Sequence, residues 1–135
     1  MIEINLTTKN REEFIDITEK LINVINQEIE KENIKDGIVI IYVPHTTAGC
    51  VINENADPSV KKDILEFLNT HIPRDKKYHH TEGNADAHIK ASIIGNSLNL
   101  IISGGKVILG SWQGIFFCEF DGPRTRKIFV QVIKK

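Results

Sequence analysis

The sequence has little of several residue types that mark common protein classes, and each shortage narrows the possibilities. Its 135 residues include only two cysteines, Cys50 and Cys118, whose spacing matches no metal-binding cysteine pair. We therefore expect free thiols in a reducing compartment and no disulfide framework. The formal net charge of −1 gives no general reason to expect a nucleic acid or an anionic membrane as a partner.

Long hydrophobic runs are also missing. The longest, Ile38 to Val43, is far too short to cross a bilayer. The first residues, Met1 to Ile4, do not combine a basic segment with an apolar one, so we expect no signal peptide and a soluble, cytoplasmic protein. Glycine-rich phosphate loops, a G-x-S-x-G nucleophile motif and C-x-x-C pairs are absent, and those enzyme classes lose support. The length predicts one domain over residues 1–135.

The N-terminal half predicts a strand, a helix and a second strand. Apolar residues alternate with polar ones over residues 2–7, which is typical of a short strand. A capping-box pattern at Asn10 predicts a long amphipathic helix that reaches about Asn33. The β-branched run 38–43 predicts a central strand buried on both faces. Residues 45–57 are expected to form a loop.

The C-terminal half predicts two helices followed by strands. Asp57 and Pro58 are typical of a helix start, and Asn84 predicts a third, short helix that Gly95 ends in a left-handed conformation. The expected strands are 98–103, 106–110, 115–120 and 128–133, with turns at Gly104-Gly105 and around Asp121-Gly-Pro123. The predicted fold class is α+β: a single domain with a mainly antiparallel, sandwich-like sheet and about three helices packed on it.

All five histidines lie between His45 and His88. Imidazole titrates near neutral pH and is the commonest metal ligand, so chemistry is first sought in this window. His45 follows a predicted strand directly and precedes Thr46 and Thr47, a position at which a rigid element can present side chains to a ligand. The alternative is a turn in which these side chains only bond loop amides.

His80 and His88 can join His45 in a set of three imidazoles, which is a common donor set for a divalent metal. Glu82 and Asp86 are then candidates for a carboxylate ligand, a supporting group or a general base. Surface histidines without partners are the alternative interpretation. The histidines that we expect at the surface are His71 and His79.

The stretch from Asn53 to Asp57 leads into the second predicted helix, whose first amides favour anions, so a phosphate can dock there. Helix capping is the simpler explanation for Asp57 alone, whereas Glu54 and Asn55 are harder to explain as caps. Trp112, the only tryptophan, either walls a pocket or fills the core, and the core is our expectation.

Two arginines and two cysteines complete the candidates. Arg124 and Arg126 flank a predicted turn and can bind phosphate bidentately, although charges at strand ends are usually solvated. Cys50 shows no sequence sign of a lowered thiol pKa and is expected to be buried. Cys118 is in phase with the apolar residues of its strand and is also expected in the core.

Six ordered segments resemble the YjbQ proteins, a family long described as uncharacterised and now often as secondary thiamine-phosphate synthases. The segments are Pro44 to Gly49, Asn53 to Pro58, Tyr78 with His80, Glu82 to Ala91, Gly110 to Gln113, and Phe120 to Arg124. Ser111 stands where the family usually has threonine, a change that keeps the hydroxyl. The match runs through nearly the whole chain.

The resemblance implies an α+β homotrimer with a polar pocket near the subunit boundary, and a divalent ion such as zinc held by His45, His80 and His88. It implies a metal-assisted enzyme that acts on a small phosphorylated metabolite, joining a pyrimidine diphosphate to a thiazole phosphate. The alternative is a non-catalytic metal- or metabolite-binding trimer. The assigned catalytic residues are Glu54, Asp57, Glu82 and Asp86, and the substrate-binding residues are Thr46, Thr47, Asn53, Asn55, Asn84, Lys90, Trp112, Gln113 and Arg124.

Overall fold

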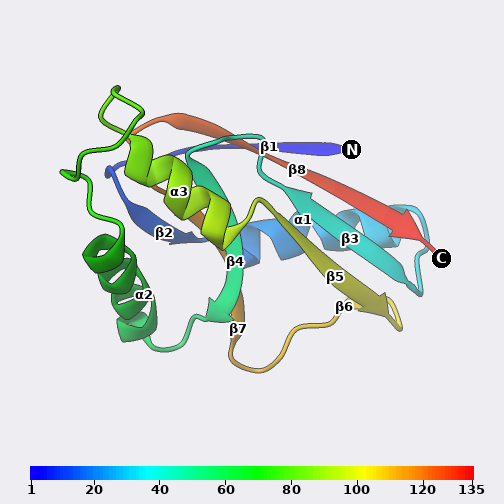
Figure 1. Ribbon diagram of the computed structural model, residues 1–135. Coiled ribbons are helices and arrows are strands. Elements are labelled where there is room, and N and C mark those ends of the chain that lie inside the picture. The colour runs from blue at the N-terminus through cyan, green and yellow to red at the C-terminus, as the bar shows by residue number, and fades with distance from the viewer.

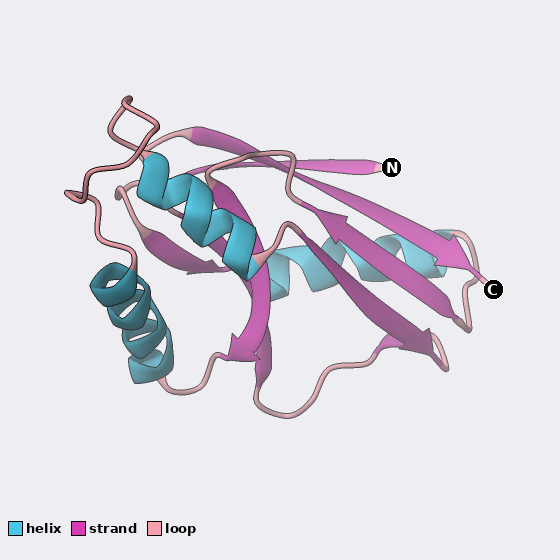
Figure 2. Cartoon of the chain, in the orientation of Figure 1, coloured by secondary structure: helices cyan, strands magenta, loops and turns pink.

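A computed structural model, which describes residues 1–135, contains two antiparallel sheets and three helices (Figures 1 and 2). The strand orders are β1-β8-β3-β5-β6 and β2-β7-β4. The elements are β1 Ile2–Thr7, β2 Glu13–Asp16, α1 Thr18–Lys31, β3 Gly37–Tyr42, β4 Ala48–Glu54, α2 Pro58–His71, α3 Ala85–Ile94, β5 Ser97–Ser103, β6 Lys106–Val107, β7 Gln113–Glu119 and β8 Thr125–Lys134. The α+β class with three helices is confirmed. No helix is long and apolar enough to cross a membrane.

The three-stranded sheet is the centre of the molecule, because helices cover both of its faces. Helix α1 packs between one face of this sheet and the inner face of the five-stranded sheet, whereas α2 and α3 cover the opposite face (Figure 1). Residues 114–119 of β7 and the following Phe120 are all buried. Phe117 belongs to the core on the α1 side and Phe116 to the core under α2 and α3. The two cysteines lie in these cores, Cys50 in the first and Cys118 in the second, as predicted.

The strand buried on both faces was predicted at residues 38–43, and that prediction is wrong. Strand β3 is central in its sheet, but helices cover only one of its faces. Val39 and Ile41 are fully buried, whereas Ile38 and Tyr42 are each 43% exposed. The β-branched run therefore places an apolar row on an open sheet face.

The helix predicted from Asn10 begins later than expected, because residues 13–16 form strand β2. The Glu13 carboxylate does accept the backbone N–H groups of Lys9 and Asn10, at 2.7 and 2.8 Å, as in a capping box. These bonds close a turn before a strand instead of starting a helix. Phe14 is buried from that strand against the core under α2 and α3, and this burial outweighs the local helix signal.

The loop predicted over residues 45–57 is also wrong in its middle, where β4 pairs with β7 along its whole length. The last two predicted strands do not pair with each other across the turn around Asp121, since β7 and β8 belong to different sheets. The turn around Asp121 therefore carries the chain from one sheet to the other. The hairpin at Gly104-Gly105 is confirmed, with φ of 58° and 75° at the two glycines.

Helices α2 and α3 begin where the sequence predicts. The Asp57 side chain caps α2 by accepting the Ser59 N–H at 2.9 Å. Helix α3 ends at Gly95, whose φ of 95° needs glycine but whose ψ of 163° is extended rather than left-handed helical. The reason is a bond from the Cys50 N–H to the Gly95 carbonyl, 3.1 Å long, which ties the end of α3 to β4. Gly49 permits this approach, because a Cβ there would collide with the same carbonyl.

Candidate histidine site

His45 lies just after β3 and is held by one bond from β8. The backbone N–H of Lys127 donates to His45 Nε2 at 2.9 Å. A backbone amide can only donate, so Nε2 must be unprotonated and the neutral ring carries its proton on Nδ1. Burial and the positive charge of Arg126 lower the pKa of His45 below its usual 6.5. His45 is therefore a neutral imidazole with an Nδ1–H donor.

The charge beside His45 belongs to a buried ion pair. Arg126 Nε donates to Glu119 at 2.9 Å, and another guanidinium nitrogen donates to Thr47 Oγ1, also at 2.9 Å. Arg126 is thus neither solvated nor free to bind phosphate, and Thr47 is directed inward. Glu119 was missed by the sequence analysis, although a carboxylate inside the apolar run 115–120 is a usable signal for a buried pair.

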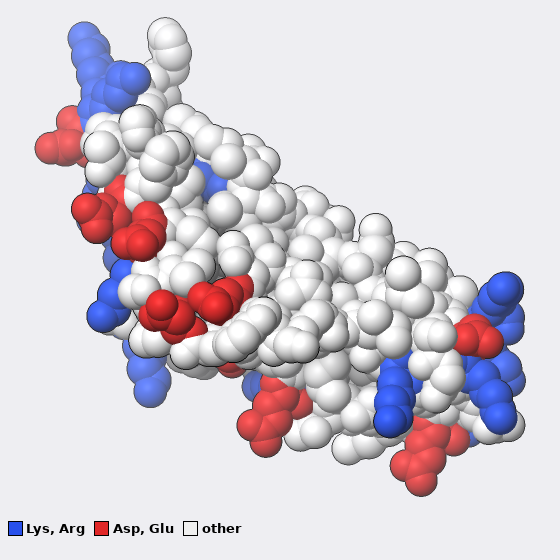
Figure 3. Space-filling model, turned by 90° about the horizontal axis from the view of Figure 1, so that it is seen from below, with Lys and Arg blue, Asp and Glu red and all other residues white.

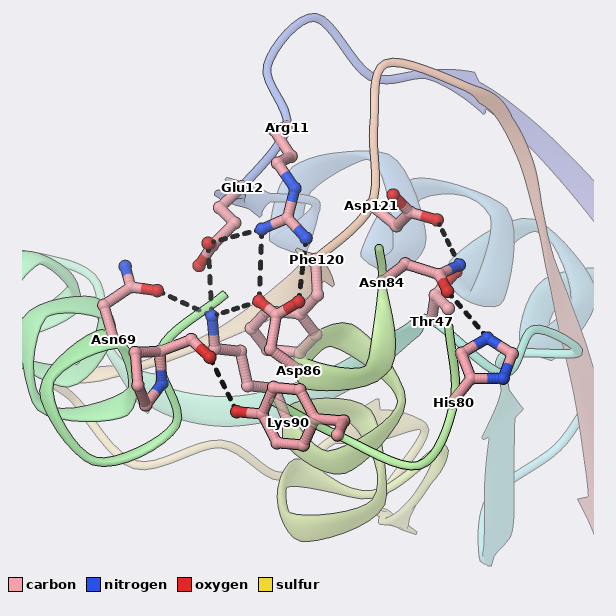
Figure 4. A network of polar contacts seen from close by, with 12 residues as sticks. Arg11, Glu12, Thr47, Asn69, His80, Asn84, Asp86, Lys90, Phe120 and Asp121 are labelled. Carbon is pink, nitrogen blue, oxygen red and sulfur yellow. Dashed lines mark hydrogen bonds and ion pairs between the residues drawn. The ribbon is translucent and has the colours of Figure 1, made fainter. Parts of the chain in front are cut away.

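His80 is held in the opposite way, by a chain of side chains that leads to Asp121 (Figure 4). Asn84 Nδ2 donates to the Asp121 carboxylate at 2.9 Å, and Asn84 Oδ1 lies 3.0 Å from His80 Nε2. A carboxylate only accepts, so the Asn84 amide has one orientation and His80 carries its proton on Nε2. The Nδ1 lone pair of His80 is then free for a proton or a metal.

Asp121 remains ionised in this chain. Its partial burial alone would raise its pKa, but hydrogen bonds from Asn84 and Arg124 outweigh burial and lower the pKa below 3.8. Arg124 donates to the Asp121 carboxylate at 3.0 Å. Arg124 and Asn84, both predicted to bind substrate, thus also orient His80. Asp121 itself was not assigned by the sequence analysis.

His88, on α3, lies between the other two histidines. Its ring is 5.2 Å from the His80 ring, centroid to centroid, in an edge-to-face arrangement. It lines a hollow of about 290 Å³ together with His45, Thr46 and Ser92. It also lines a second hollow of about 390 Å³ together with His80 and Tyr78. The three predicted histidines therefore lie along two hollows that share His88, while His71 and His79 are exposed as expected.

The three imidazoles do not form one ligand cluster. The structure contains no group of three His, Cys, Asp or Glu side chains arranged to hold a metal ion. His80 and His88 are close enough to share an ion, since a zinc–nitrogen bond is about 2.1 Å long. The Nε2 atom of His45 is engaged with Lys127. Within one chain, therefore, only two of the three predicted histidines, His80 and His88, are placed to bind the same metal ion.

Asp86 and Lys90 lie in a buried network instead of lining a hollow (Figure 4). Both side chains are fully buried and pair with each other at 2.9 Å. Asp86 also binds Arg11 at 2.9 Å, and Lys90 Nζ contacts Glu12 and Asn69 at 3.2 and 2.6 Å. Burial alone would raise the pKa of Asp86, but these cations lower it. A substrate reaches neither group without opening the network, so we assign both to structure.

The remaining predicted residues lie at the opposite end of β4. The seven residues of this strand span about 20 Å. At that far end a small hollow of about 50 Å³ is lined by Glu54, Asn55, Asp57 and Lys61. Trp112 accepts the Asn55 N–H through its backbone carbonyl, and the residue is 65% exposed, so the expected core position is wrong. The predicted residues outside both the histidine hollows and the buried network are Asn53, Glu54, Asn55, Asp57, Trp112 and Gln113.

Comparisons with known proteins agree in both sequence and fold. The family model described as "UPF0047 protein YjbQ-like" matches residues 2–135. A UPF0047 protein of Methanocaldococcus jannaschii is 53% identical over 133 residues, which cover 98% of this chain and 94% of that protein. YugU of Bacillus subtilis is 45% identical, with 96% of each chain covered.

Solved structures show the same likeness. An uncharacterised conserved protein of the YjbQ/UPF0047 family from Clostridium acetobutylicum superposes with a TM-score of 0.90 at 50% identity, covering 98% of this chain and 100% of that one. A YbjQ-like protein of unknown function from Sulfolobus solfataricus gives a TM-score of 0.91 at 32% identity, covering 99% and 96%.

Proposed function

This chain belongs to the YjbQ-like UPF0047 family, and we propose that it is an enzyme acting on a small phosphorylated metabolite at the two histidine-lined hollows. The opposite tautomers of His45 and His80 carry this proposal. His80 offers a free Nδ1 lone pair, which is a base or a metal ligand. His45 offers an Nδ1–H, which is a donor to an anionic oxygen. A lone pair that can hold a metal ion and an N–H donor, on either side of His88, suit the binding and activation of one anionic substrate.

A divalent ion such as zinc is the cofactor that we propose. His80 and His88 would hold it, and water, substrate or another copy of the chain would complete its coordination. When bound, the ion supplies positive charge that neutralises phosphate oxygens. The metal content of protein purified without a histidine tag tests this directly. We expect stoichiometric metal in the wild type and its loss in His88→Ala.

Among the four predicted carboxylates, Glu82 is the one that stands beside the histidines, with Oε2 3.5 Å from His80 Nε2. Asp86 is enclosed in ion pairs, and Glu54 and Asp57 lie at the far end of β4. The proton-transfer groups that one chain brings together are therefore imidazoles, supported by an exposed carboxylate. This narrows the catalytic assignment to His45, His80 and Glu82.

The reaction that we propose to assay first joins a pyrimidine diphosphate to a thiazole phosphate. A carbon–nitrogen bond to the thiazole forms, the carbon–oxygen bond to the diphosphate breaks, and thiamine phosphate and diphosphate are released. Charge on the leaving diphosphate must be stabilised as that bond breaks. The donor His45 and the metal proposed at His80 and His88 serve this need.

Diphosphate release is the readout that tests the enzyme. We expect His45→Ala and His80→Ala each to lower turnover by at least about a hundredfold, the first through loss of a proton donor and the second through loss of a metal ligand. His71→Ala is the matched control, since His71 is exposed on α2 and lines neither hollow. Unchanged turnover in both site variants, with unfolding temperature and assembly retained, would contradict the proposal.

A binding module without turnover is the second candidate. The observation that favours it is the lack of a buried, unpaired carboxylate beside the histidines, because Asp86 is committed to ion pairs. Such a module binds the metal and a phosphorylated ligand, and the ligand raises the unfolding temperature without product formation. Ligand stabilisation without product from the pyrimidine diphosphate and the thiazole phosphate would favour this candidate.

We also propose that the chain assembles as a homotrimer. The open face of the five-stranded sheet supports this, because Ile133, Ile38 and Ile101 are cross-strand neighbours on β8, β3 and β5 and are 42–62% exposed. They line a hollow of about 460 Å³. Figure 3, which views the molecule from below, shows the charged side chains mainly at the two ends of the molecule and along one edge of this view. Apolar surface of this kind is typical of contacts between subunits.

A further inference from the structure

The segment between α2 and α3 carries three cations that the proposed mechanism does not use. Arg74, Lys76 and Lys77 fall within four residues, and none takes part in an ion pair or a side-chain hydrogen bond of the structure. By contrast, Lys90 and Arg124, which were predicted to bind substrate, are already paired with Asp86 and Asp121. The free positive charge nearest in sequence to the histidine hollows is therefore on this segment.

These cations line one hollow, which we call the loop hollow. It measures about 270 Å³ and is bounded by Arg74, Lys76 and Lys77 on one side and by Thr81 and Gly83 on the other. No acidic residue lines it. The Lys76 ammonium lies 5.8 Å from the centre of the Tyr78 ring, and Tyr78 is also a lining residue. The Tyr78 hydroxyl itself donates to the Pro73 carbonyl at 2.6 Å, so the cations, with no carboxylate among the lining residues, select an anion.

The N-terminal end of α3 also favours an anion in the loop hollow. Ala85, the first residue of α3, lines the loop hollow. The preceding Asn84 makes no capping bond, because its side chain is committed to His80 and Asp121. The first amides of α3 thus add partial positive charge beside the hollow, while the Asp86 carboxylate in the same turn is buried and paired with Arg11 and Lys90. This charge acts in the same direction as the three cationic side chains.

The loop hollow adjoins the His80–His88 hollow, because both are lined by Tyr78, His80 and Ala85. We propose that the loop hollow binds the phosphate or diphosphate group of the substrate and so presents the rest of the substrate to the histidines. This assignment rests on the proposed function only for the identity of the substrate. The binding of a bare phosphate or diphosphate anion follows from the lining itself.

Calorimetric titration with inorganic diphosphate, at low and fixed ionic strength, tests the site in the full chain. We expect Lys76→Gln/Lys77→Gln to weaken binding by about tenfold or more, the effect of losing one to two charge-assisted bonds. Arg74→Gln should weaken it as well. The matched control is Lys31→Gln/Lys35→Gln, which removes the same charge near the end of α1, away from the hollow.

Equal weakening in the control pair would overturn the proposal, since binding would then follow net charge alone. The proposal would also be overturned if the wild type did not bind diphosphate. All the substituted residues are exposed, and unchanged unfolding temperatures will verify that the variants fold.

His80→Ala separates this proposal from the enzymatic one. Turnover that survives in His80→Ala, with loop-dependent diphosphate binding, overturns only the role proposed for His80 in turnover. Turnover that is lost in His80→Ala but unchanged in the loop variants, with no effect on diphosphate binding, overturns only the loop site.

Discussion

At the residue scale, a single hydrogen-bond partner decides what each histidine can do. His45 and His80 have the same side chain and both border the site. The backbone amide of Lys127 makes one of them a proton donor at Nδ1, whereas the Asn84 carbonyl makes the other an acceptor at Nδ1. Sequence spacing can select histidines that come together, but it contains no information about which nitrogen carries the proton.

This difference is directly measurable by nuclear magnetic resonance. Long-range nitrogen–proton correlation spectra of the imidazoles at pH 7.5 should show His45 protonated at Nδ1 and His80 protonated at Nε2. Assignment uses the loss of one ring system in His45→Gln and in His80→Gln. Identical tautomers for the two rings would contradict the hydrogen bonds on which the proposed function depends.

The lowered pKa of His45 also predicts a pH dependence of folding. The unfolded chain binds a proton near pH 6.5, whereas the folded chain binds it only at lower pH. The stability that the neutral form of His45 contributes is therefore fully present above pH 6.5. It is lost as the pH falls from 6.5 through the pKa of His45 in the folded chain. The paired carboxylates Asp86 and Asp121 have pKa values below 3.8, so their contribution is lost only in stronger acid.

Denaturant unfolding at pH 7.5, 6.5 and 5.5 measures this effect. We expect the free energy of unfolding of the wild type to fall between pH 6.5 and 5.5, and the fall to be smaller in His45→Gln. His71→Gln is the control and should keep the wild-type slope. A wild-type stability that does not change over this range would show that the folded His45 titrates normally.

At the element scale, α3 is positioned by contacts at its two ends. Near its start, Asp86 and Lys90 pair with Arg11 and Glu12 from the β1–β2 connection and with Asn69 of α2. At its end, the Gly95 carbonyl accepts from the Cys50 N–H of β4. Since α3 carries His88, these contacts set the position of that ring relative to His45 and His80.

Loss of the buried carboxylate should be costly. In Asp86→Ala, the Lys90 ammonium and the Arg11 guanidinium lose their common partner inside the protein. Breaking a buried pair in this way costs about 3 kcal/mol or more of unfolding free energy. Urea denaturation measures it, with the exposed Lys62→Ala as the control. A cost similar to that of the control would show that the network is solvated.

The contact at the other end of α3 has its own test. In Gly49→Ala, the new methyl group meets the Gly95 carbonyl, which is backbone and cannot turn aside. The strand and helix must separate, at a cost of about 1–3 kcal/mol. Ala56→Ser, an exposed change beyond β4, should leave stability unchanged. If Gly49→Ala had the same free energy of unfolding as the wild type, β4 and α3 would not be tightly joined.

Elements with a long, regular pattern could be predicted from the sequence, and short or interrupted ones could not. Helix α2 was found from its Asp57 cap and apolar stripe, although Phe67 on that stripe is 62% exposed. Strand β2 has only four residues beside a strong helical pattern, and β4 begins within the polar stretch after His45. Both were missed because pairing with β7, which is distant in sequence, stabilises them.

At the scale of the whole molecule, the open face of the five-stranded sheet is the feature that one chain does not explain. Its central strand was predicted to be buried on both faces, and helices cover only one. An apolar row through Ile133, Ile38 and Ile101 remains. If other copies cover this row, as proposed, the sequence pattern describes the assembled protein rather than the single chain.

Substitution in the middle of that row tests the assembly. Ile38→Glu places a charge between Ile101 and Ile133, and burying it in a subunit contact is unfavourable. We expect trimers for the wild type and monomers for this variant in sedimentation velocity at micromolar concentration. Asn26→Glu, on the exposed side of α1, is the control and should stay trimeric. A monomeric wild type would contradict the proposed trimer.

The sequence by itself determined the family, the α+β class, the starts of α2 and α3 and the histidines that border the hollows, because those properties follow from local patterns and motifs. Only the tertiary structure decided the protonation of His45, the burial of Asp86 and Lys90, and the separation of the Asn53–Asp57 stretch from the histidines. The bond that sets His45 joins residues 82 positions apart, and the one that orients Asn84 spans 37. Such partners meet only after the sheets and helices have packed, so no local pattern specifies them.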